Sequence, residues 1–164
     1  MTYYSFIKTA ADNLLLLADT HFLTGVYVLN QKYFPEIQKN WFLNNDLEIF
    51  KETTKQLNEY FAGSRYSFNI EYKLNGTKLQ ELVWNRLVEI EYGKTISYKE
   101  LAQEILYPTA VRAVATAVGY NPFTFIIPCH RVIGKDGKLR GYASGLDLKQ
   151  RLLDFEMSKS SPFL

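Results

Sequence analysis

The sequence predicts an α+β protein, with a small N-terminal α/β unit built on an antiparallel sheet and a mostly helical C-terminal part that contains a helix-turn-helix. The first third of the chain is rich in aromatic and β-branched residues between polar interruptions, which is typical of strands and hairpins. The second half carries apolar residues three and four positions apart, which is typical of amphipathic helices. The length of 164 residues fits one domain or two small ones, and a hydrophobic content of 47% is enough for a core.

The N-terminal domain, residues 1–74, is expected to hold the sheet and one helix. Strands and one or two hairpins are expected within "YYSFIKT" and "NLLLLADTHFLTGVYVL". A helix is expected over 46–63 and a further strand over 66–74. The turn signal "NGT" directly after that strand marks the boundary to a second domain, residues 75–164.

The second domain is expected to open with a helix capped by Thr77 and closed by Gly93. Its last helix is expected to begin at Asp147 as N-cap, after a glycine-rich basic loop over 134–145. Leu148, Leu152 and Phe155 supply the apolar face of that last helix, and Glu156 lies near its end.

Two short helices are expected between these, within about 97–119. Ser97 and Glu100 have the spacing of a capping box for the first of them. Thr109 is a candidate N-cap for the second, over 110–118. Two short helices joined by a tight turn fit a helix-turn-helix and fit a plain αα-hairpin equally well.

The second of these short helices consists mostly of Ala and Val, and Arg112 is its only long charged residue. It is either a buried helix whose Arg reaches water or a helix that lies against nucleic acid with the Arg as a probe. Residues 76–164 hold 12 Lys and Arg against 9 Asp and Glu, whereas residues 1–75 hold 7 against 8. This excess points to a polyanionic partner, although ordinary solvated charge explains it equally well.

Cys129 is the only cysteine and lies in "IIPCHRVIG", residues 126–134. A single cysteine excludes an intramolecular disulfide and any multi-cysteine zinc or iron–sulfur site. Since His21 and His130 are the only histidines, we expect no metal and no cofactor. The apolar run Leu14–Ala18 is too short to span a membrane, so we expect no membrane partner and a cytoplasmic location.

A thiol with an ordinary pKa is a few per cent thiolate at pH 7, so a catalytic Cys129 needs a base. His130 is its neighbour, but consecutive side chains of an extended chain point to opposite faces, so contact needs a bend or a bridging water. Pro128 helps to hold such a bend, and Glu156 is a candidate to orient the imidazole. An inert structural cysteine or a cysteine hydrolase fits the composition as well.

Four segments resemble one protein family. They are "SYKELA" (97–102), "RAV" (112–114), "NPFTFIIPCHRVIG" (121–134) and "GYASGLDLKQRLLDFE" (141–156). Their order and spacing are similar to those of the O6-alkylguanine-DNA alkyltransferases, also called methylated-DNA–protein-cysteine methyltransferases. The resemblance covers nearly all of 76–157 and is loose in the N-terminal domain.

The resemblance implies direct-reversal DNA repair, by irreversible, stoichiometric transfer of a methyl or other alkyl group from O6-alkylguanine, with O4-methylthymine as a further substrate, to Cys129. The damaged base would be flipped out of the helix. His130 would act as the base through a bound water, with Glu156 behind it. Tyr98 would donate a proton or hydrogen bond to the guanine, and Asn121 would brace the turn after the recognition helix.

The resemblance also implies double-stranded DNA as the partner, bound in the minor groove by a monomer. Arg112 would fill the gap left by the flipped nucleotide. The other DNA contacts would be Tyr98, Lys99, Thr109, Ala110 and Ala113. The pocket would be lined by Pro128, Val132, Tyr142, Ala143 and Ser144.

Some residues depart from the family pattern, and two other functional classes stay open. Ala115 stands where many members have Gly, Ser144 where Gly or Trp is usual, and Glu91 where Pro is frequent. A non-catalytic binder of alkylated DNA would lack Cys129. A helix-turn-helix transcription factor would leave the Pro-Cys-His-Arg-Val run unexplained.

Overall fold

The computed structural model describes residues 1–158 and Phe163, which form two compact units. The first unit comprises 1–74 together with Phe163, and the second comprises 75–158. Phe163, which the sequence assigned to the second domain, packs edge-on against Phe61 of the first unit with 5.1 Å between the ring centroids. The α+β class is confirmed, with an antiparallel sheet in the first unit and mainly helices in the second.

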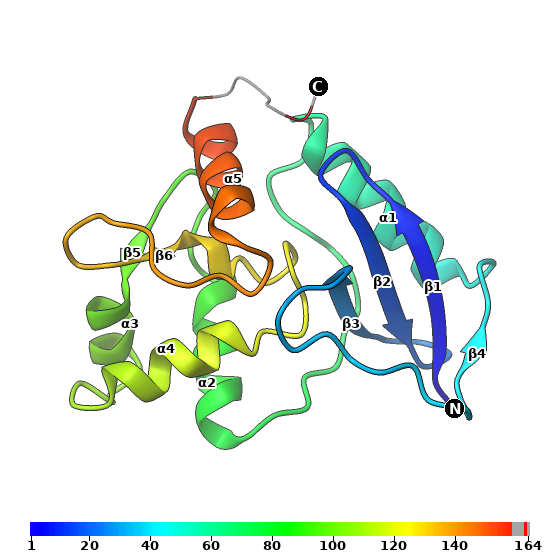
Figure 1. Ribbon diagram of the computed structural model, residues 1–164, viewed down its shortest axis with the longest axis horizontal. Helices are drawn as coiled ribbons and strands as arrows, with labels where there is room; N and C mark the ends of the chain where they lie inside the picture. Colours follow the sequence, from blue (N-terminus) through cyan, green and yellow to red (C-terminus); the bar gives the residue numbers. More distant parts are fainter. Residues whose placement is uncertain (159–162, 164) are drawn as a thin grey trace. The chain divides into compact units, whose positions relative to one another are not determined.

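The first unit is built on a four-stranded sheet in the order β3-β2-β1-β4 (Figure 1). Its two antiparallel pairs, β1 with β2 and β2 with β3, confirm the expected hairpins. The last strand pairs parallel to β1 over only two residues. The strands are β1 (Tyr3–Lys8), β2 (Asn13–Ala18), β3 (Leu23–Val28) and β4 (Phe42–Leu43).

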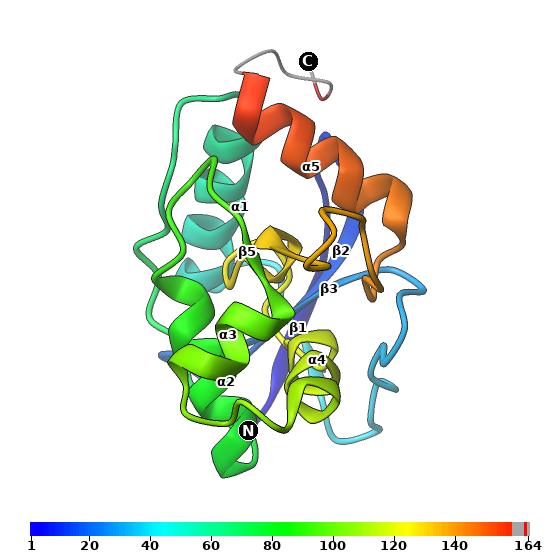
Figure 2. The same ribbon diagram turned by 90° about the vertical axis from the view of Figure 1, so that its left-hand side faces the viewer.

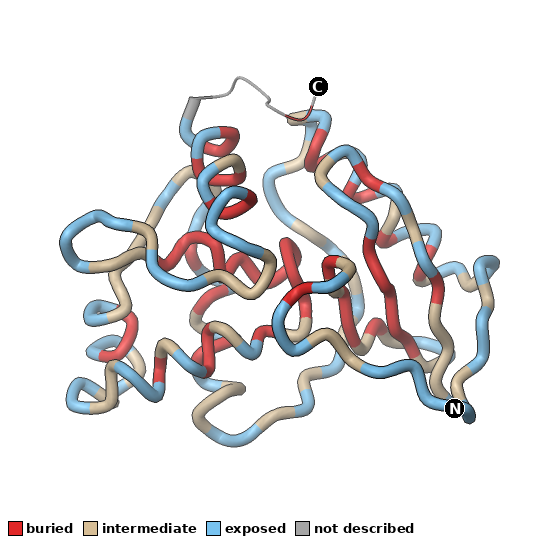
Figure 3. Tube along the Cα trace, viewed as in Figure 1, coloured by how far each residue is buried: buried red, intermediate tan, exposed pale blue. Residues whose placement is uncertain are grey.

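The run of four leucines, Leu14–Leu17, forms the buried centre of this sheet, because β2 has a neighbour on each side (Figure 3). Helix α1 (Glu48–Phe61) packs against β2 with buried residues that include Phe50 and Leu57. It ends just before Gly63, whose φ of +81° is a left-handed conformation that favours glycine. The predicted helix over 46–63 is therefore confirmed with shorter ends.

The strand predicted over 66–74 is wrong. The segment makes one isolated parallel bridge, between Leu23 and Tyr72. Two backbone bonds hold it there, from Leu23 N to Glu71 O and from Lys73 N to Leu23 O. The side chains of 66–74 alternate in exposure as those of a strand do, but among the described residues the remaining backbone groups of this segment have no partner strand to pair with.

The second unit surrounds the segment around Cys129 with helices (Figures 1 and 2). A single 3-10 turn, η1, contains the cysteine, and a short parallel pair of strands, β5 and β6, lies beside it. The helices are α2 (Lys78–Val88), α3 (Tyr98–Glu104), α4 (Val111–Gly119) and α5 (Leu146–Ser158). The short elements are η1 (Cys129–Arg131), β5 (Ile96–Ser97) and β6 (Val132–Ile133).

The predicted helix starts are partly right. Thr77 caps α2 and Ser97 caps α3, each through a complete capping box, with Gln80 and Glu100 as the reciprocal partners. The prediction that Thr109 caps α4 is wrong, because the N-cap of α4 is Ala110 and no side chain caps this helix. The predicted start of the last helix at Asp147 is also wrong by a residue or two, because α5 already begins at Leu146.

Helix α4 is anchored to α2 by a buried hydrogen bond, in which Trp84 Nε1 donates to Ala117 O at 2.9 Å. Val114, Ala117 and Val118 are buried on the same helix. One face of α4 is thus fixed in the core, and its opposite face is held in place at the surface. Among the described residues, no helix has the length and apolar character needed to cross a bilayer.

Candidate active site

Cys129 lies in a bend, because the chain turns through η1 directly after Pro128. Cys129 N donates to Ile127 O at 2.8 Å, and Arg131 N donates to Pro128 O at 3.0 Å. Consecutive side chains in this tight turn do not alternate as they do in a strand. A bend, one of the two alternatives that the sequence left open, is present at the thiol, and Cys129 keeps 7% of its surface exposed.

His130 and Glu156 lie together although 26 positions separate them. Their side chains are fully buried, and 2.7 Å separates His130 Nε2 from Glu156 Oε1. Burial lowers the pKa of His130, although the carboxylate acts in the opposite direction. A neutral imidazole that donates to a carboxylate through Nε2 presents Nδ1 as an acceptor. That Nδ1 is buried and has no hydrogen-bond partner among residues 1–158 and 163.

Arg131, which the sequence analysis did not single out, binds the same carboxylate. Its Nε donates to Glu156 Oε2 and its Nη2 to Glu156 Oε1, both at 2.9 Å. Its Nη1 donates to Ile90 O at 2.6 Å. Burial alone would raise the pKa of Glu156, but the contacts with His130 and Arg131 hold that pKa well below its usual range. Glu156 is therefore a carboxylate at neutral pH.

Burial raises the pKa of the Cys129 thiol, so the resting residue is a thiol rather than a thiolate. Three side chains act in the opposite direction and lower the pKa of Cys129: Asn121 and Tyr142 through polar contact with the thiol and Lys149 through its charge. The site thus holds a protonated nucleophile among groups that stabilise its anion. Such a nucleophile needs a base when it reacts.

Asn121 folds the segment that leads to the cysteine. Its Oδ1 accepts from Phe123 N at 2.9 Å, and its Nδ2 donates to Ile127 O at 2.7 Å. The side chain is buried, so these bonds brace the turn that follows α4.

Lys149 is a second charged residue that the sequence analysis missed. It is fully buried, and its Nζ donates to Arg140 O at 2.8 Å and to Gly141 O and Tyr98 Oη at 3.3 Å each. Burial lowers the pKa of Lys149 to about 8. A signal for it exists, because Lys149 lies three and four positions before the buried Leu152 and Leu153 and two helical turns before Glu156.

Tyr98, at the start of α3, faces the same group. Its hydroxyl donates to Arg140 O at 3.3 Å and accepts from Lys149. Burial and the nearby Cys129 raise the pKa of Tyr98 to about 12, so the phenol keeps its proton at neutral pH. Tyr98 is therefore a protonated phenol near the thiol, and its single O–H is directed at Arg140 O in this structure.

The residues assigned to the pocket fall into two groups. Pro128 and Val132 are buried on either side of the turn, whereas Tyr142, Ala143 and Ser144 are half-buried in the loop before α5. The hydroxyl of Tyr142 is buried beside the Cys129 thiol, and within the described chain it makes no hydrogen bond of good geometry. Burial and the nearby Cys129 and Glu156 raise the pKa of Tyr142 far above its usual value.

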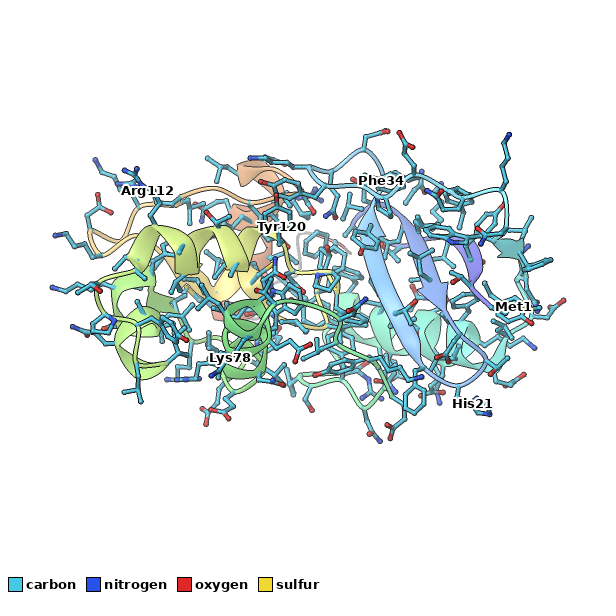
Figure 4. All side chains as sticks on the ribbon, turned by 90° about the horizontal axis from the view of Figure 1, so that it is seen from below. Met1, His21, Phe34, Lys78, Arg112 and Tyr120 are labelled. Atoms are coloured by element: carbon cyan, nitrogen blue, oxygen red, sulfur yellow. The ribbon has the colours of Figure 1, made fainter. Side chains whose placement is uncertain are left out.

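The residues assigned to DNA lie on the surface of the α3–α4 pair. Arg112, Ala113 and Thr116 are exposed on α4, on the face opposite its buried residues, and Figure 4 shows Arg112 pointing away from the helix. Within the described chain, the Arg112 guanidinium makes no ion pair or hydrogen bond. Lys99 and Thr109 are also exposed, and Ala110 is half-buried.

The structure therefore brings one set of predicted residues together and leaves another apart. Cys129, His130, Glu156, Asn121, Tyr98 and Tyr142 form one connected cluster with the unpredicted Arg131 and Lys149. The predicted DNA contacts other than Tyr98 belong to a separate exposed surface. In the described part of the chain, His, Cys, Asp and Glu form no group of three that could hold a metal ion.

Two family models match the chain and together cover almost all of it. The model for "6-O-methylguanine DNA methyltransferase, DNA binding domain" matches residues 78–158. The model for "6-O-methylguanine DNA methyltransferase, ribonuclease-like domain" matches residues 2–74. These matches fall on either side of the turn at 75–77.

Relatives and solved structures agree with the family models. A methylated-DNA–protein-cysteine methyltransferase of Methanosarcina acetivorans is 44% identical over 156 residues, which cover 95% of this chain and 99% of the relative. A protein of the same name from Mycobacterium tuberculosis is 42% identical over 160 residues, covering 98% and 95%. The crystal structure of M. tuberculosis OGT in complex with DNA matches with a TM-score of 0.90 and 39% identity, covering 98% of this chain and 96% of that one.

Proposed function

The chain belongs to the 6-O-methylguanine DNA methyltransferase family, and from this premise we propose that it repairs O6-alkylguanine in DNA by moving the alkyl group irreversibly to Sγ of Cys129. The observation that carries the proposal is the buried cluster in which His130 and Glu156 lie behind the only thiol of the chain. Its relatives are named for this chemistry, and a structural neighbour is bound to DNA.

The first step is removal of the thiol proton. Glu156 accepts from Nε2 and so fixes the imidazole tautomer in which Nδ1 carries the free lone pair. Nδ1, which is buried and has no hydrogen-bond partner in the described chain, takes the proton from Cys129 through a bound water. The resulting thiolate is stabilised by the Asn121 amide and by the charge of Lys149.

The second step is displacement at the alkyl carbon. The bond from sulfur to carbon forms as the bond from carbon to O6 breaks, and its electron pair returns to the guanine. Tyr98 donates a hydrogen bond or a proton to the leaving guanine, for which its raised pKa of about 12 keeps it protonated. Pro128, Val132, Tyr142, Ala143 and Ser144 would form the walls around the base, and the exclusion of water by these walls would strengthen the electrostatic contacts.

The DNA side is assigned to the exposed face of α4. A base inside a duplex cannot be reached by a buried sulfur, so it must leave the stack. The small side chains of α4 allow close approach in the minor groove, and Arg112 fills the space of the flipped nucleotide. Lys99, Thr109, Ala110 and Ala113 would contact the adjacent backbone, in a helix-turn-helix formed by α3 and α4.

The product is a thioether, which has no acidic proton and is a poor leaving group. Each molecule therefore reacts once. We propose that the protein acts as a monomer in the cytoplasm, that residues 1–74 serve as a scaffold, and that O4-methylthymine is a second substrate. Ser144 at the rim would decide how large an alkyl group is accepted.

A titration with excess damaged DNA tests the proposal. Repaired guanine, measured by digestion and chromatography, should plateau at one equivalent per protein molecule. Cys129→Ser should repair none while retaining DNA binding, and Cys129→Ala should behave in the same way. Continued turnover beyond one equivalent, or repair by either variant, would contradict the proposed function.

A further inference from the structure

Glu156 serves two partners, and only one of them is the proposed base. Its Oε1 lies 2.7 Å from His130 Nε2 and 2.9 Å from Arg131 Nη2, and its Oε2 lies 2.9 Å from Arg131 Nε. The guanidinium thus engages both carboxylate oxygens in a bidentate pair, which is the strongest geometry for these groups. The imidazole of His130 shares Glu156 Oε1 with the guanidinium of Arg131.

The guanidinium is held from other directions as well. Arg131 Nη1 donates to Ile90 O at 2.6 Å, and the guanidinium carbon lies 5.7 Å from the centroid of the Tyr92 ring. The Arg131 side chain is 7% exposed and that of Glu156 is 1% exposed. This is a fixed and almost fully desolvated ion pair, not a surface contact.

The charge of the Glu156 carboxylate is balanced directly by Arg131. Arginine keeps its charge in proteins, so Arg131 and the Glu156 carboxylate cancel while His130 and Cys129 are both uncharged. Without the guanidinium, the carboxylate would be a buried charge with no counter-charge. The nearest group able to supply one is His130, by taking up a proton.

A protonated His130 could not accept the thiol proton, because both of its ring nitrogens would already carry one. We propose that Arg131 is a positioning residue that, through its own charge and by holding both oxygens of Glu156, keeps the imidazole of His130 uncharged so that Nδ1 remains free to receive the proton of Cys129. This inference rests on the proposed function, since it concerns the base of that reaction.

The other charged groups near His130 agree with this role. Glu156 raises the pKa of His130, whereas Arg131 and Lys149 lower it, in addition to the larger lowering caused by burial. Helix α2 also packs against η1, and its buried residues are the apolar Val83, Trp84 and Leu87. The charged residues of α2 are all at least partly exposed: Lys78, Glu81 and Arg86.

The test is the titration of His130 by NMR, in the full chain without DNA. The chain has only two histidines, so a His21→Gln background leaves one ring to follow, and His21 lies in the first unit. In Arg131→Met, which removes the charge and all three donor nitrogens, His130 should protonate roughly one pH unit or more above the parent, a tenfold or greater gain in proton affinity. Arg131→Lys, which keeps the charge, should stay close to the parent.

A second pair of variants isolates the guanidinium and covers the case in which Arg131→Met does not fold. Glu156→Gln and the double variant Arg131→Met/Glu156→Gln both lack the carboxylate, so neither leaves it unpaired. His130 should protonate at a higher pH in the double variant than in Glu156→Gln. An unchanged titration in folded Arg131→Met, or no difference within the second pair, would overturn the inference. Because no DNA is present, such a failure is distinguishable from a failure of methyl transfer.

Discussion

Replacing Glu156 by Gln should destabilise the second unit by about 3–5 kcal/mol, the range found when one partner of a buried ion pair is removed. The carboxylate accepts from His130 Nε2 and from two nitrogens of Arg131, all at 2.9 Å or less. Gln offers one acceptor oxygen, and its amide nitrogen would face donors. The Arg131 guanidinium would then be buried without a counter-charge.

Urea denaturation followed by Trp84 fluorescence measures this loss. A Trp41→Phe background removes the only other tryptophan, and Trp84 is buried in the second unit. The matched control is Glu89→Gln, because Glu89 pairs with Arg86 at 3.8 Å and its side chain is 72% exposed. That control should lose less than about 1 kcal/mol. A loss below about 1 kcal/mol in Glu156→Gln, equal to a surface pair, would refute the reasoning.

The same variant should change the dependence of stability on pH. The pKa of Glu156 in the folded state lies below its unfolded value of about 4.3, so the ionised carboxylate adds stability above that pH. This stability is lost as the pH falls through the folded value. The difference in unfolding free energy between the parent and Glu156→Gln should therefore shrink on acidification, and a difference that is constant down to acid denaturation would contradict the low pKa.

Three further predictions concern the nucleophile and the DNA. Lys149→Met removes a charge that stabilises the Cys129 thiolate, so a thiol-alkylating reagent should modify Cys129 more slowly at pH 7, and an unchanged rate would show that the charge of Lys149 does not act on the sulfur. In the unmodified protein the pKa of Lys149 is about 8, so this effect should fade above that pH. Arg112→Ala should slow repair of duplex DNA by roughly 10- to 100-fold, because unstacking the damaged base costs a few kcal/mol that Arg112 partly offsets. The reaction with free O6-methylguanine base should stay nearly unchanged. Equal losses on both substrates would show that Arg112 has no role in base flipping. Methylation of Cys129 adds a carbon to a packed site with 7% exposure and should lower the stability by about 1–3 kcal/mol, seen as a fall in Tm; an unchanged Tm would contradict it.

Helix starts were predicted well where the signal is local. The Thr77 and Ser97 capping boxes each depend on a partner three residues away, so the sequence contains the whole interaction. Thr109 has the right residue type, but no bond forms to its side chain, since α4 starts after Ala110. The strand expected over 66–74 failed because its pairing depends on residues around Leu23, far away in the chain.

The active-site cluster depends on contacts between distant positions, so the sequence predicted it only in part. The link between His130 and Glu156 was implied by a family resemblance, which carries long-range information that spacing does not. Arg131 and Lys149 were missed because charged residues are mostly exposed, and nothing local shows that Arg131 is buried. Lys149 has the clearer signal, a lysine on the apolar face of a helix.

The most direct test of the account is the mass of the protein after reaction with an oligonucleotide that contains O6-methylguanine. Intact mass spectrometry should show the addition of one methyl group, and peptide mapping should locate it on Cys129, the only thiol of the chain. The same treatment of Cys129→Ser should leave its mass unchanged. An unmodified protein beside repaired DNA, or a methyl group on any other residue, would contradict the central claim that this buried sulfur is the acceptor.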